Sequence, residues 1–222
     1  MQGDSHGERP SFRSLAVARE TTGILDRRTG GYALRTMTVL TTARLRLEPL
    51  SDVHLEEFNA MNSDPEVMRY LSGKPETLDE SRAVIERVKA RWAKLGYAWW
   101  ALVERDTGEM AGAGILQNLR REATLQPDLD CPLEIGWRLR RDHWGRGFAS
   151  EAAFAIAGFA FEALQAEELL AVCHPDNRAS STVMERLGMQ PQGLQHWYGK
   201  GLTTYRIEVG QWRANAKARA QR

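Results

Sequence analysis

The sequence predicts a single α/β domain of the α+β type with a mixed sheet, and three observations support this. The chain has 222 residues, which is enough for one large hydrophobic core and short for two domains. Apolar residues make up 42% of the chain and charged residues 27%, the balance of a soluble globular protein. Segments with the two-residue period of strands alternate along the chain with segments that have the period of helices.

A strand and two helix starts open this pattern. Arg44–Leu50 alternates strictly between polar and apolar residues, as a half-buried strand does. Ser51 or Asp52 can cap a helix that continues to about Met61. Asp64-Pro65-Glu66 opens a further helical turn, because proline is favoured at the first helical position.

A long helix and a hairpin follow. Residues 78–95 carry an apolar stripe at helical spacing, formed by Ile85, Val88, Trp92 and Leu95. Residues 97–104 are aromatic and β-branched, and after the turn sequence DTGE the segment 110–116 returns as the second strand. Trp99 and Trp100 must face opposite sides of this strand, so we expect one indole in the core and the other on a binding face.

Six further segments continue the alternation. They are strands at 133–139 and 169–173, helices at 147–164 and 177–187, and strand-like segments at 190–198 and 203–209. Gly188 follows the second helix where a left-handed C-cap is expected. The last two strands are expected at the edge of the sheet, where they could pair across a homodimer.

The two ends of the chain differ from this pattern. Residues 1–36 contain Gly, Ser, Thr and scattered charge without an apolar period, so we expect a loosely ordered extension. The domain then spans 37–212, and Met37 could be its true start. The last ten residues, RANAKARAQR (213–222), carry four basic side chains and no acidic ones, which predicts a frayed basic tail.

Charge and cysteine content exclude several classes of protein. Thirty basic and 29 acidic residues leave a net charge of +1, which argues against a nucleic-acid binder. No apolar run approaches the roughly 20 residues of a membrane-spanning helix, and the N-terminus lacks the apolar stretch of a secretory signal. Cys131 and Cys173 form no CxxC pair, so we expect neither a disulfide framework nor a metal site, and a cytoplasmic location. Cys173, at a strand end, is expected to be a small core residue.

The segment WGRGFASEA, residues 144–152, has the composition of an anion site. A strand, a glycine-containing loop and a helix start follow one another there, so backbone N–H groups and the helix dipole can face a phosphate. The segment is neither a Walker loop, which requires GxxxxGK[ST], nor a Rossmann loop, because Ser150 stands at the third glycine position. A plain nucleotide site and a structural turn therefore stay open on this loop alone.

Four motifs in order carry a resemblance to a known family. EIGW, WGRGFASEA, HPDNRAS and ERLGM together resemble the GCN5-related N-acetyltransferase (GNAT) family, and most closely its RimJ/RimL-like ribosomal-protein N-acetyltransferase branch. SDPEVMRYL at 63–71 resembles an early helical region of that branch. The resemblance covers Arg44 to Val209. It implies a mostly antiparallel sheet flanked by helices and splayed between 133–139 and 169–173, with acetyl-CoA bound there as co-substrate and no metal.

The resemblance also implies which residues hold the cofactor. The backbone of Trp137, Arg138 and Leu139 would pair with the pantetheine arm. The family's phosphate motif falls on Trp144, Gly145, Arg146, Gly147, Phe148 and Ala149, with Ser150 next to it, and its first position is Trp in place of Gln or Arg. Asn177 matches the family's cofactor-contacting Asn. Arg140, Arg141 and Arg146 could meet the 3′-phosphate of the nucleotide, or form a solvated basic surface.

Two candidate catalytic residues follow from the chemistry. An amine must be neutral to attack a thioester, so a base is needed, and Glu134 on a strand beside the expected cofactor site is the candidate. An ion pair with Arg138 is its alternative. Many relatives place a Tyr seven residues after the Asn as an acid, and some a Glu five residues before it; this chain has Met184 and Val172 there. Ser180 is the remaining acid candidate, or it only hydrogen-bonds the helix start.

The sequence therefore predicts transfer of an acetyl group from acetyl-CoA to an amine, favouring the N-terminal amine of a protein or peptide. A small-molecule amine is the alternative acceptor. A non-catalytic acyl-CoA sensor is the alternative of another class, because the expected Tyr and Glu are absent. His143 and His174 are expected as surface loop residues that flank the cofactor.

Overall fold

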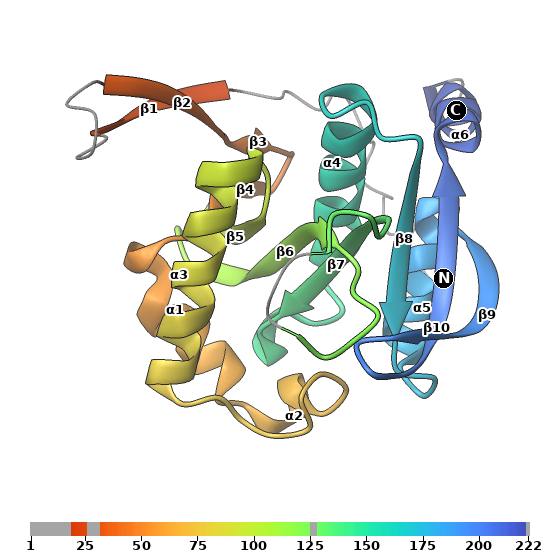
Figure 1. Cartoon of the computed structure of the whole chain (residues 1–222), viewed down its shortest axis with the longest axis horizontal. Helices are drawn as coiled ribbons and strands as arrows, with labels where there is room; N and C mark the ends of the chain where they lie inside the picture. Colours follow the sequence, from red (N-terminus) through yellow and green to blue (C-terminus); the bar gives the residue numbers. More distant parts are fainter. Residues whose placement is uncertain (1–18, 26–31, 125–127, 221–222) are drawn as a thin grey trace, which may run out of the picture.

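The computed structural model describes residues 19–25, 32–124 and 128–220. Eight strands form one sheet in the order β3-β4-β5-β6-β7-β8-β10-β9 (Figure 1). Neighbouring strands are antiparallel except β7 and β8, which are parallel. The predicted fold class, a mixed and mostly antiparallel sheet with helices, is confirmed.

The element bounds follow the sequence pattern closely. The strands of this sheet are β3 (Leu40–Thr41), β4 (Leu45–Pro49), β5 (Trp99–Glu104), β6 (Met110–Asn118), β7 (Leu133–Leu139), β8 (Glu168–Cys173), β9 (Gln190–Trp197) and β10 (Lys200–Glu208). The helices are η1 (Asp52–His54), α1 (Leu55–Asn62), α2 (Pro65–Met68), α3 (Leu78–Leu95), η2 (Arg141–His143), α4 (Phe148–Glu162), α5 (Arg178–Leu187) and α6 (Val209–Ala220). In the described ranges no helix combines the length and the apolarity that crossing a membrane requires.

Local capping chemistry explains why the helices begin and end where they do. The Thr77 hydroxyl accepts from the Glu80 backbone and the Glu80 carboxylate accepts from the Thr77 backbone, so a capping box starts α3. The Asn177 side chain caps α5 by accepting from the Ser180 backbone N–H, without a reciprocal bond. Left-handed Gly96 and Gly188 end these two helices, as predicted for Gly188.

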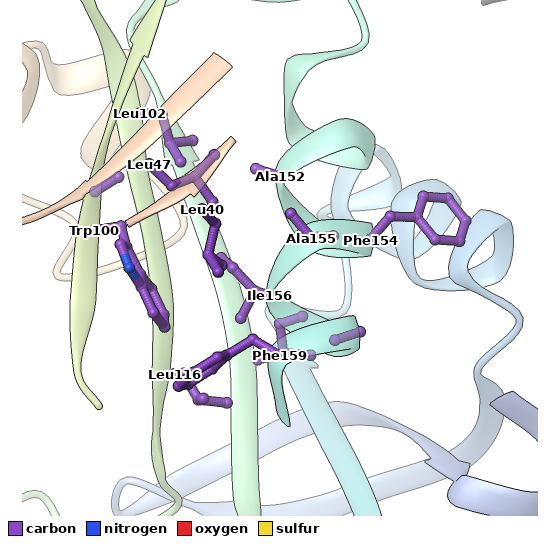
Figure 2. Close-up of a cluster of buried hydrophobic side chains, with 14 of the residues drawn as sticks. Leu40, Leu47, Trp100, Leu102, Leu116, Ala152, Phe154, Ala155, Ile156 and Phe159 are labelled. Atoms are coloured by element: carbon purple, nitrogen blue, oxygen red, sulfur yellow. The ribbon is translucent and has the colours of Figure 1, made fainter. Parts of the chain in front are cut away.

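The two faces of the sheet carry different helices. On β6, Gly114 lies against Ile156 of α4, whereas Gln117, three residues on and therefore on the opposite face, receives a hydrogen bond from Arg91 of α3. Figure 2 shows Ile156 and Phe159 of α4 pointing at the core residues of the strands, which are Leu40, Leu47, Trp100, Leu102 and Leu116. Trp100 is fully buried in this core and Trp99 is half-buried on the other face, which confirms the predicted division of the two indoles.

Strands β7 and β8 part almost as soon as they meet. β7 pairs with β6 along its whole length, but with β8 it shares a single register pair, Glu134 with Leu170. Figure 1 shows β7 and β8 diverging. At the far end of β7, the position of a Cβ on Gly112 would lie 2.2 Å from the Arg138 carbonyl oxygen, so only glycine allows β6 to approach there. The predicted splay between 133–139 and 169–173 is confirmed.

The expectations for the two chain ends need correction. Within the predicted loose extension 1–36, the described residues form a hairpin of β1 (Arg19–Leu25) and β2 (Tyr32–Thr38), while 1–18 and 26–31 lie outside the described residues. Threonines that suggested a loop also favour strands. The prediction of a frayed tail was wrong for residues 213–220, which belong to α6. The four alanines in this segment favour a helix. The expected boundaries at 36/37 and 212/213 therefore fall inside β2 and α6.

The predicted edge strands are corrected in the same way. β10 lies between β8 and β9, so only β9 forms the sheet edge on that side. Its residues are mostly exposed, including Leu194 at 67%. Strand pairing across a homodimer stays a prediction. Of these two strands only β9 has a free edge for it, because β10 is paired on both sides.

One buried carboxylate ties the start of α4 to the start of the sheet. Glu151 accepts hydrogen bonds from the Thr42 hydroxyl at 2.6 Å and from the Arg44 backbone N–H at 2.8 Å. Nε and Nη2 of Arg44 complete the site at 2.7 and 2.6 Å. Because α4 begins just after the 144–147 loop, this cluster fixes the loop against the β3–β4 turn.

Replacing Glu151 with alanine should lower the free energy of unfolding by about 2–3 kcal/mol, since hydrogen bonds to charged groups contribute roughly that much. Arg44 stays partly solvated, which limits the loss. Urea unfolding of Glu151→Ala checks this, with the exposed Glu162→Ala of the same helix as control, expected within about 0.5 kcal/mol of wild type. Equal stabilities of the two variants would contradict the role of the cluster.

Candidate functional site

The loop before α4 presents backbone donors. Gly145 and Gly147 have φ of +75° and +82°, a conformation that favours glycine, and Gly147 is the N-cap of α4. Since glycine has no side chain to cap the helix, the first N–H groups of α4 lack the side-chain acceptor that α3 and α5 have. These N–H groups, with the helix dipole, are available to an anion, and the anion site at this loop stays a prediction.

A second polar group in this first helical turn lacks a partner. The Ser150 hydroxyl is buried and makes no hydrogen bond to the described residues. A buried, unpaired hydroxyl is costly unless a ligand completes it. The donors at the start of α4 therefore fit the phosphates of a nucleotide-type cofactor.

Most of the loop's side chains serve the protein itself. Trp144 is 47% exposed, and its Nε1 donates to the Leu139 carbonyl at 3.0 Å, which fastens the loop to the end of β7. Arg146 forms an ion pair with Glu104 and lies over the Phe148 ring at 4.6 Å, and Phe148 is fully buried. Phe148 can thus contribute to a cofactor site only through its backbone, and the Arg146 side chain, although 44% exposed, is already paired with Glu104. Ala149 is half-buried beside Ser150.

Ion pairs distinguish the three arginines for which the sequence predicts a 3′-phosphate contact. Arg140 pairs with Asp142 at 2.7 Å, and its guanidinium lies 3.9 Å from Glu57. Arg146 forms an ion pair with Glu104, so two of the three predicted arginines already have carboxylate partners. Arg141 forms no ion pair with a described residue. A hollow of about 450 Å³ lies between α1, α2 and residues 140–142, beside this arginine.

The histidine expectations are partly wrong. His143 is 3% exposed and lies in η2, where its Nδ1 is 2.8 Å from Asp142 and its Nε2 3.5 Å from Glu104. It is therefore a buried structural residue, which helix η2 folds inward, and not a surface loop residue. His174 is half-buried at the end of β8, and its ring stacks on Tyr70 at 5.4 Å.

Residues of β7 become partly exposed where the strand leaves β8. Trp137, Arg138 and Leu139 are all half-buried, whereas Glu134 and Ile135 at the point of contact with β8 are buried. β8 supplies no register partner beyond Glu134, so the backbone of 137–139 faces it unpaired. This is the arrangement that an extended ligand arm could complete as an added strand.

Glu134 lies at the vertex of the divergence inside a polar cluster. Its carboxylate accepts hydrogen bonds from the Gln117 amide at 3.0 Å and from the Tyr198 hydroxyl. Burial raises the pKa of Glu134, and the two hydrogen bonds oppose this rise. The alternative expectation of an ion pair with Arg138 is not met, because the Arg138 guanidinium bonds elsewhere.

Sequence reasoning missed Tyr198 and Gln117. Gln117 orients the cluster, since its amide also donates to the Tyr198 hydroxyl at 3.0 Å while its carbonyl accepts from Arg91 and Trp99. Burial, then the charge of Glu134, raise the pKa of Tyr198 well above its usual range. The available sequence signal for Gln117 was its position as a polar residue directly after the small and apolar run MAGAGIL. Tyr198, which adopts a left-handed backbone conformation before Gly199, had no such signal.

The start of α5 brings Asn177 and Ser180 together. The Asn177 carbonyl oxygen accepts from the Ser180 backbone N–H at 3.2 Å, which leaves the amide NH₂ of Asn177 as a donor for a cofactor. Ser180 is half-buried.

Met184 and Cys173 belong to the core. Both are buried, as predicted for Cys173, and the Cys173 Sγ lies 3.6 Å from the Ser181 hydroxyl. No cluster of His, Cys, Asp and Glu suited to a metal exists among the residues described.

Comparison with known proteins adds independent findings. Residues 44–190 match the family described as acetyltransferase (GNAT) domain. The chain is 30% identical over 178 residues to the uncharacterized N-acetyltransferase YoaA of Bacillus subtilis (strain 168), covering 77% of this chain and 94% of YoaA. An acetyltransferase structure from Agrobacterium tumefaciens str. C58 matches with a TM-score of 0.64 and 29% identity, over 77% of this chain and 94% of that one.

A further solved structure concerns the RimJ/RimL-like branch. RimL, described as a ribosomal L7/L12 α-N-protein acetyltransferase in complex with coenzyme A, matches with a TM-score of 0.62. The match covers 75% of this chain and 95% of RimL at 17% identity, a level that shows a common fold only.

The buried Glu134 predicts a characteristic pH dependence of stability. Its pKa is raised in the folded state, so its stabilising contribution is complete below the unfolded pKa of about 4.3 and is lost as pH rises through the folded pKa. Glutamine at position 134 cannot titrate. The free energy of unfolding of Glu134→Gln, relative to that of wild type, should therefore increase as pH rises from 4 to 8, by at most about 1.4 kcal/mol per pH unit. Urea unfolding across this range measures it; the exposed Glu162→Gln should show a constant difference, and the same constancy in Glu134→Gln would refute the prediction.

Proposed function

The chain belongs to the acetyltransferase (GNAT) domain family, and from this premise we propose that it transfers an acetyl group from acetyl-CoA to an amine in the cytoplasm. The favoured acceptor is the N-terminal amine of a protein or peptide. The observation that carries the proposal is that β7 parts from β8 beside an uncapped α4 start with an unpaired Ser150 hydroxyl. Membership of the RimJ/RimL-like branch stays a prediction, because RimL shares the fold only.

The cofactor would be held mainly by backbone. The N–H groups of Gly145, Gly147 and the first turn of α4, with the Ser150 hydroxyl, would bind the pyrophosphate. The unpaired stretch 137–139 of β7 would pair with the pantetheine arm, and the Asn177 amide would donate from the facing side. Arg141 is the arginine left for the 3′-phosphate.

The chemistry requires a base. Bound acetyl-CoA supplies the thioester carbonyl carbon that the acceptor attacks, so that a C–N bond forms and the C–S bond breaks. Glu134 would take the proton that the amine loses, and its raised pKa makes it a better base than an exposed carboxylate. The thiolate needs little acid help, since a thiol has a pKa of about 8.5, so solvent can supply its proton where no side chain does. Ser180 at the start of α5 remains the candidate for assisting it.

Two other functions are kept as alternatives. A small-molecule amine as acceptor would use the same residues, because the family membership does not fix the acceptor. A non-catalytic acyl-CoA sensor is favoured by Met184 and Val172, which replace the Tyr and Glu expected in the family. Release of free CoA thiol that depends on an added amine distinguishes either enzyme from the sensor.

Titration calorimetry should show acetyl-CoA binding that Gly145→Trp weakens at least tenfold, because an indole would fill the space over the loop N–H groups. Gly96→Trp is the matched control. The two glycines match in backbone conformation, with φ of +76° at Gly96 and +75° at Gly145, and an added Cβ meets nothing within 4 Å at either position. Gly96 ends α3 and does not belong to the loop before α4. ATP and NAD should bind more weakly than acetyl-CoA. Folded wild type that binds no acetyl-CoA, or equal affinities of the two variants, would refute the cofactor site.

Glu134→Gln should lower kcat/KM for amine acetylation by about 10²–10⁴, the usual range for a general base, while Glu162→Gln leaves it unchanged. In Tyr198→Phe the carboxylate loses a hydrogen bond that lowers its pKa, so the acidic limb of the kcat/KM profile should move to higher pH. Thiol release measured from pH 5 to 9 tests both. A Glu134→Gln variant with wild-type rate would assign the base to another group.

A further inference from the structure

Arg138 is a half-buried cation whose guanidinium has no carboxylate partner among the described residues. It extends from β7 toward α1 and α2, where its Nη1 donates to the Asn62 carbonyl oxygen at 2.8 Å and lies 3.9 Å from the Met68 sulfur. Its guanidinium carbon lies 5.5 Å from the Trp99 ring centre. Its Nε is buried and donates to no described residue.

A carboxylate compensates the charge of Arg138 only indirectly, through Asn62. Among the described residues, no Asp or Glu oxygen lies within 4.0 Å of its guanidinium. Glu76 is the nearest source of negative charge, but its carboxylate already accepts from the Asn62 amide at 2.7 Å and from the Ser81 hydroxyl at 3.3 Å. Burial lowers the pKa of Arg138. A buried guanidinium with unused donors is unfavourable by itself, so an anionic ligand would relieve it.

Arg138 shares its face of the sheet with the proposed base. Side chains at 134 and 138 of one strand point the same way. A continuous set of contacts joins them: Glu134 to Gln117 at 3.0 Å, Gln117 to the Trp99 Nε1 at 3.1 Å, and the Trp99 ring to Arg138. A group bound by Arg138 would therefore lie several bonds from an amine at Glu134.

The surroundings favour a negative ligand. Arg91 donates to Gln117, and Arg120 lies over the Tyr198 ring at 4.9 Å with its own Nε buried and unpaired among the described residues. The charges of both arginines act on the Glu134 carboxylate and lower its pKa. The resulting positive potential attracts an acceptor that carries negative charge.

We propose that Arg138 selects acceptors that carry a carboxylate several bonds from the reacting amine, for example a peptide with an acidic residue just after its N-terminus. The inference rests on the proposed acetyl transfer and names the acceptor class for it. Guanidinium suits this role because its fork of donors matches a carboxylate. Pairing would also end the isolation of the buried charge.

The test compares matched peptide amides, Ala-Glu-Ala and Ala-Gln-Ala, which differ only in the charge of one side chain. Wild type should acetylate the acidic peptide with at least tenfold higher kcat/KM. In Arg138→Met the ratio should fall to within about threefold of one, whereas Arg213→Met, on exposed α6, should keep the wild-type ratio. Arg138→Gln is the second neutral variant, since its amide can still donate to Asn62. A wild type without preference for the acidic peptide, or neutral variants that keep the wild-type ratio, would overturn the proposal.

A binding measurement separates this proposal from the proposed function. If no amine releases thiol, acetyl transfer has failed, and calorimetry of both peptides with CoA-saturated protein decides the role of Arg138. Tighter binding of the acidic peptide to wild type, lost in a folded neutral variant, supports the proposal even then. Equal binding of the two peptides, or no binding of either, overturns it.

Discussion

The separation of β7 from β8 is the constraint on which the rest of the structure depends. Two parallel strands joined by one register pair, Glu134 with Leu170, must leave backbone groups unpaired beyond it. The separation is held from both sides. β6 pairs with β7 along its length, while α4 forms the crossover from β7 to β8 and α5, which follows β8, packs against α4 and β8. Unpaired backbone is costly in a protein interior, so a sheet built this way favours a ligand that supplies the missing partner.

The start of α4 depends on the same geometry. The chain leaves the end of β7, turns through Gly145 and Gly147, and enters α4 without a side-chain cap for its first N–H groups. The Glu151–Arg44 cluster and the Arg146–Glu104 pair hold this turn against β4 and β5. The polar side chains of the loop are thus used for rigidity, and its backbone remains for binding.

Charge is distributed unequally across the vertex. Glu134 is a buried carboxylate held by two neutral donors, Gln117 and Tyr198. Of the described arginines near it, Arg91 donates to Gln117, Arg120 lies over the Tyr198 ring and Arg138 donates to Asn62. This arrangement keeps Glu134 from being neutralised by an ion pair, so its affinity for a proton stays high. It also leaves Arg138 without an ionic partner on the same face, which is the basis for proposing an anionic acceptor.

The sequence by itself determined the element order, the ends of α5 and the glycine turn before α4. Periodicity, Asn177, Gly188 and WGRGFASEA determine these because they act through neighbours in the chain. Alanine-rich α6 and the threonine-rich hairpin β1–β2 were misjudged, since their composition is ambiguous locally. Only the tertiary structure decided that Tyr198 meets Glu134 across 64 positions, that His143 is buried, and that Arg138 lacks a carboxylate. These facts depend on which strands lie side by side and how far they diverge, and no spacing along the chain encodes that distance.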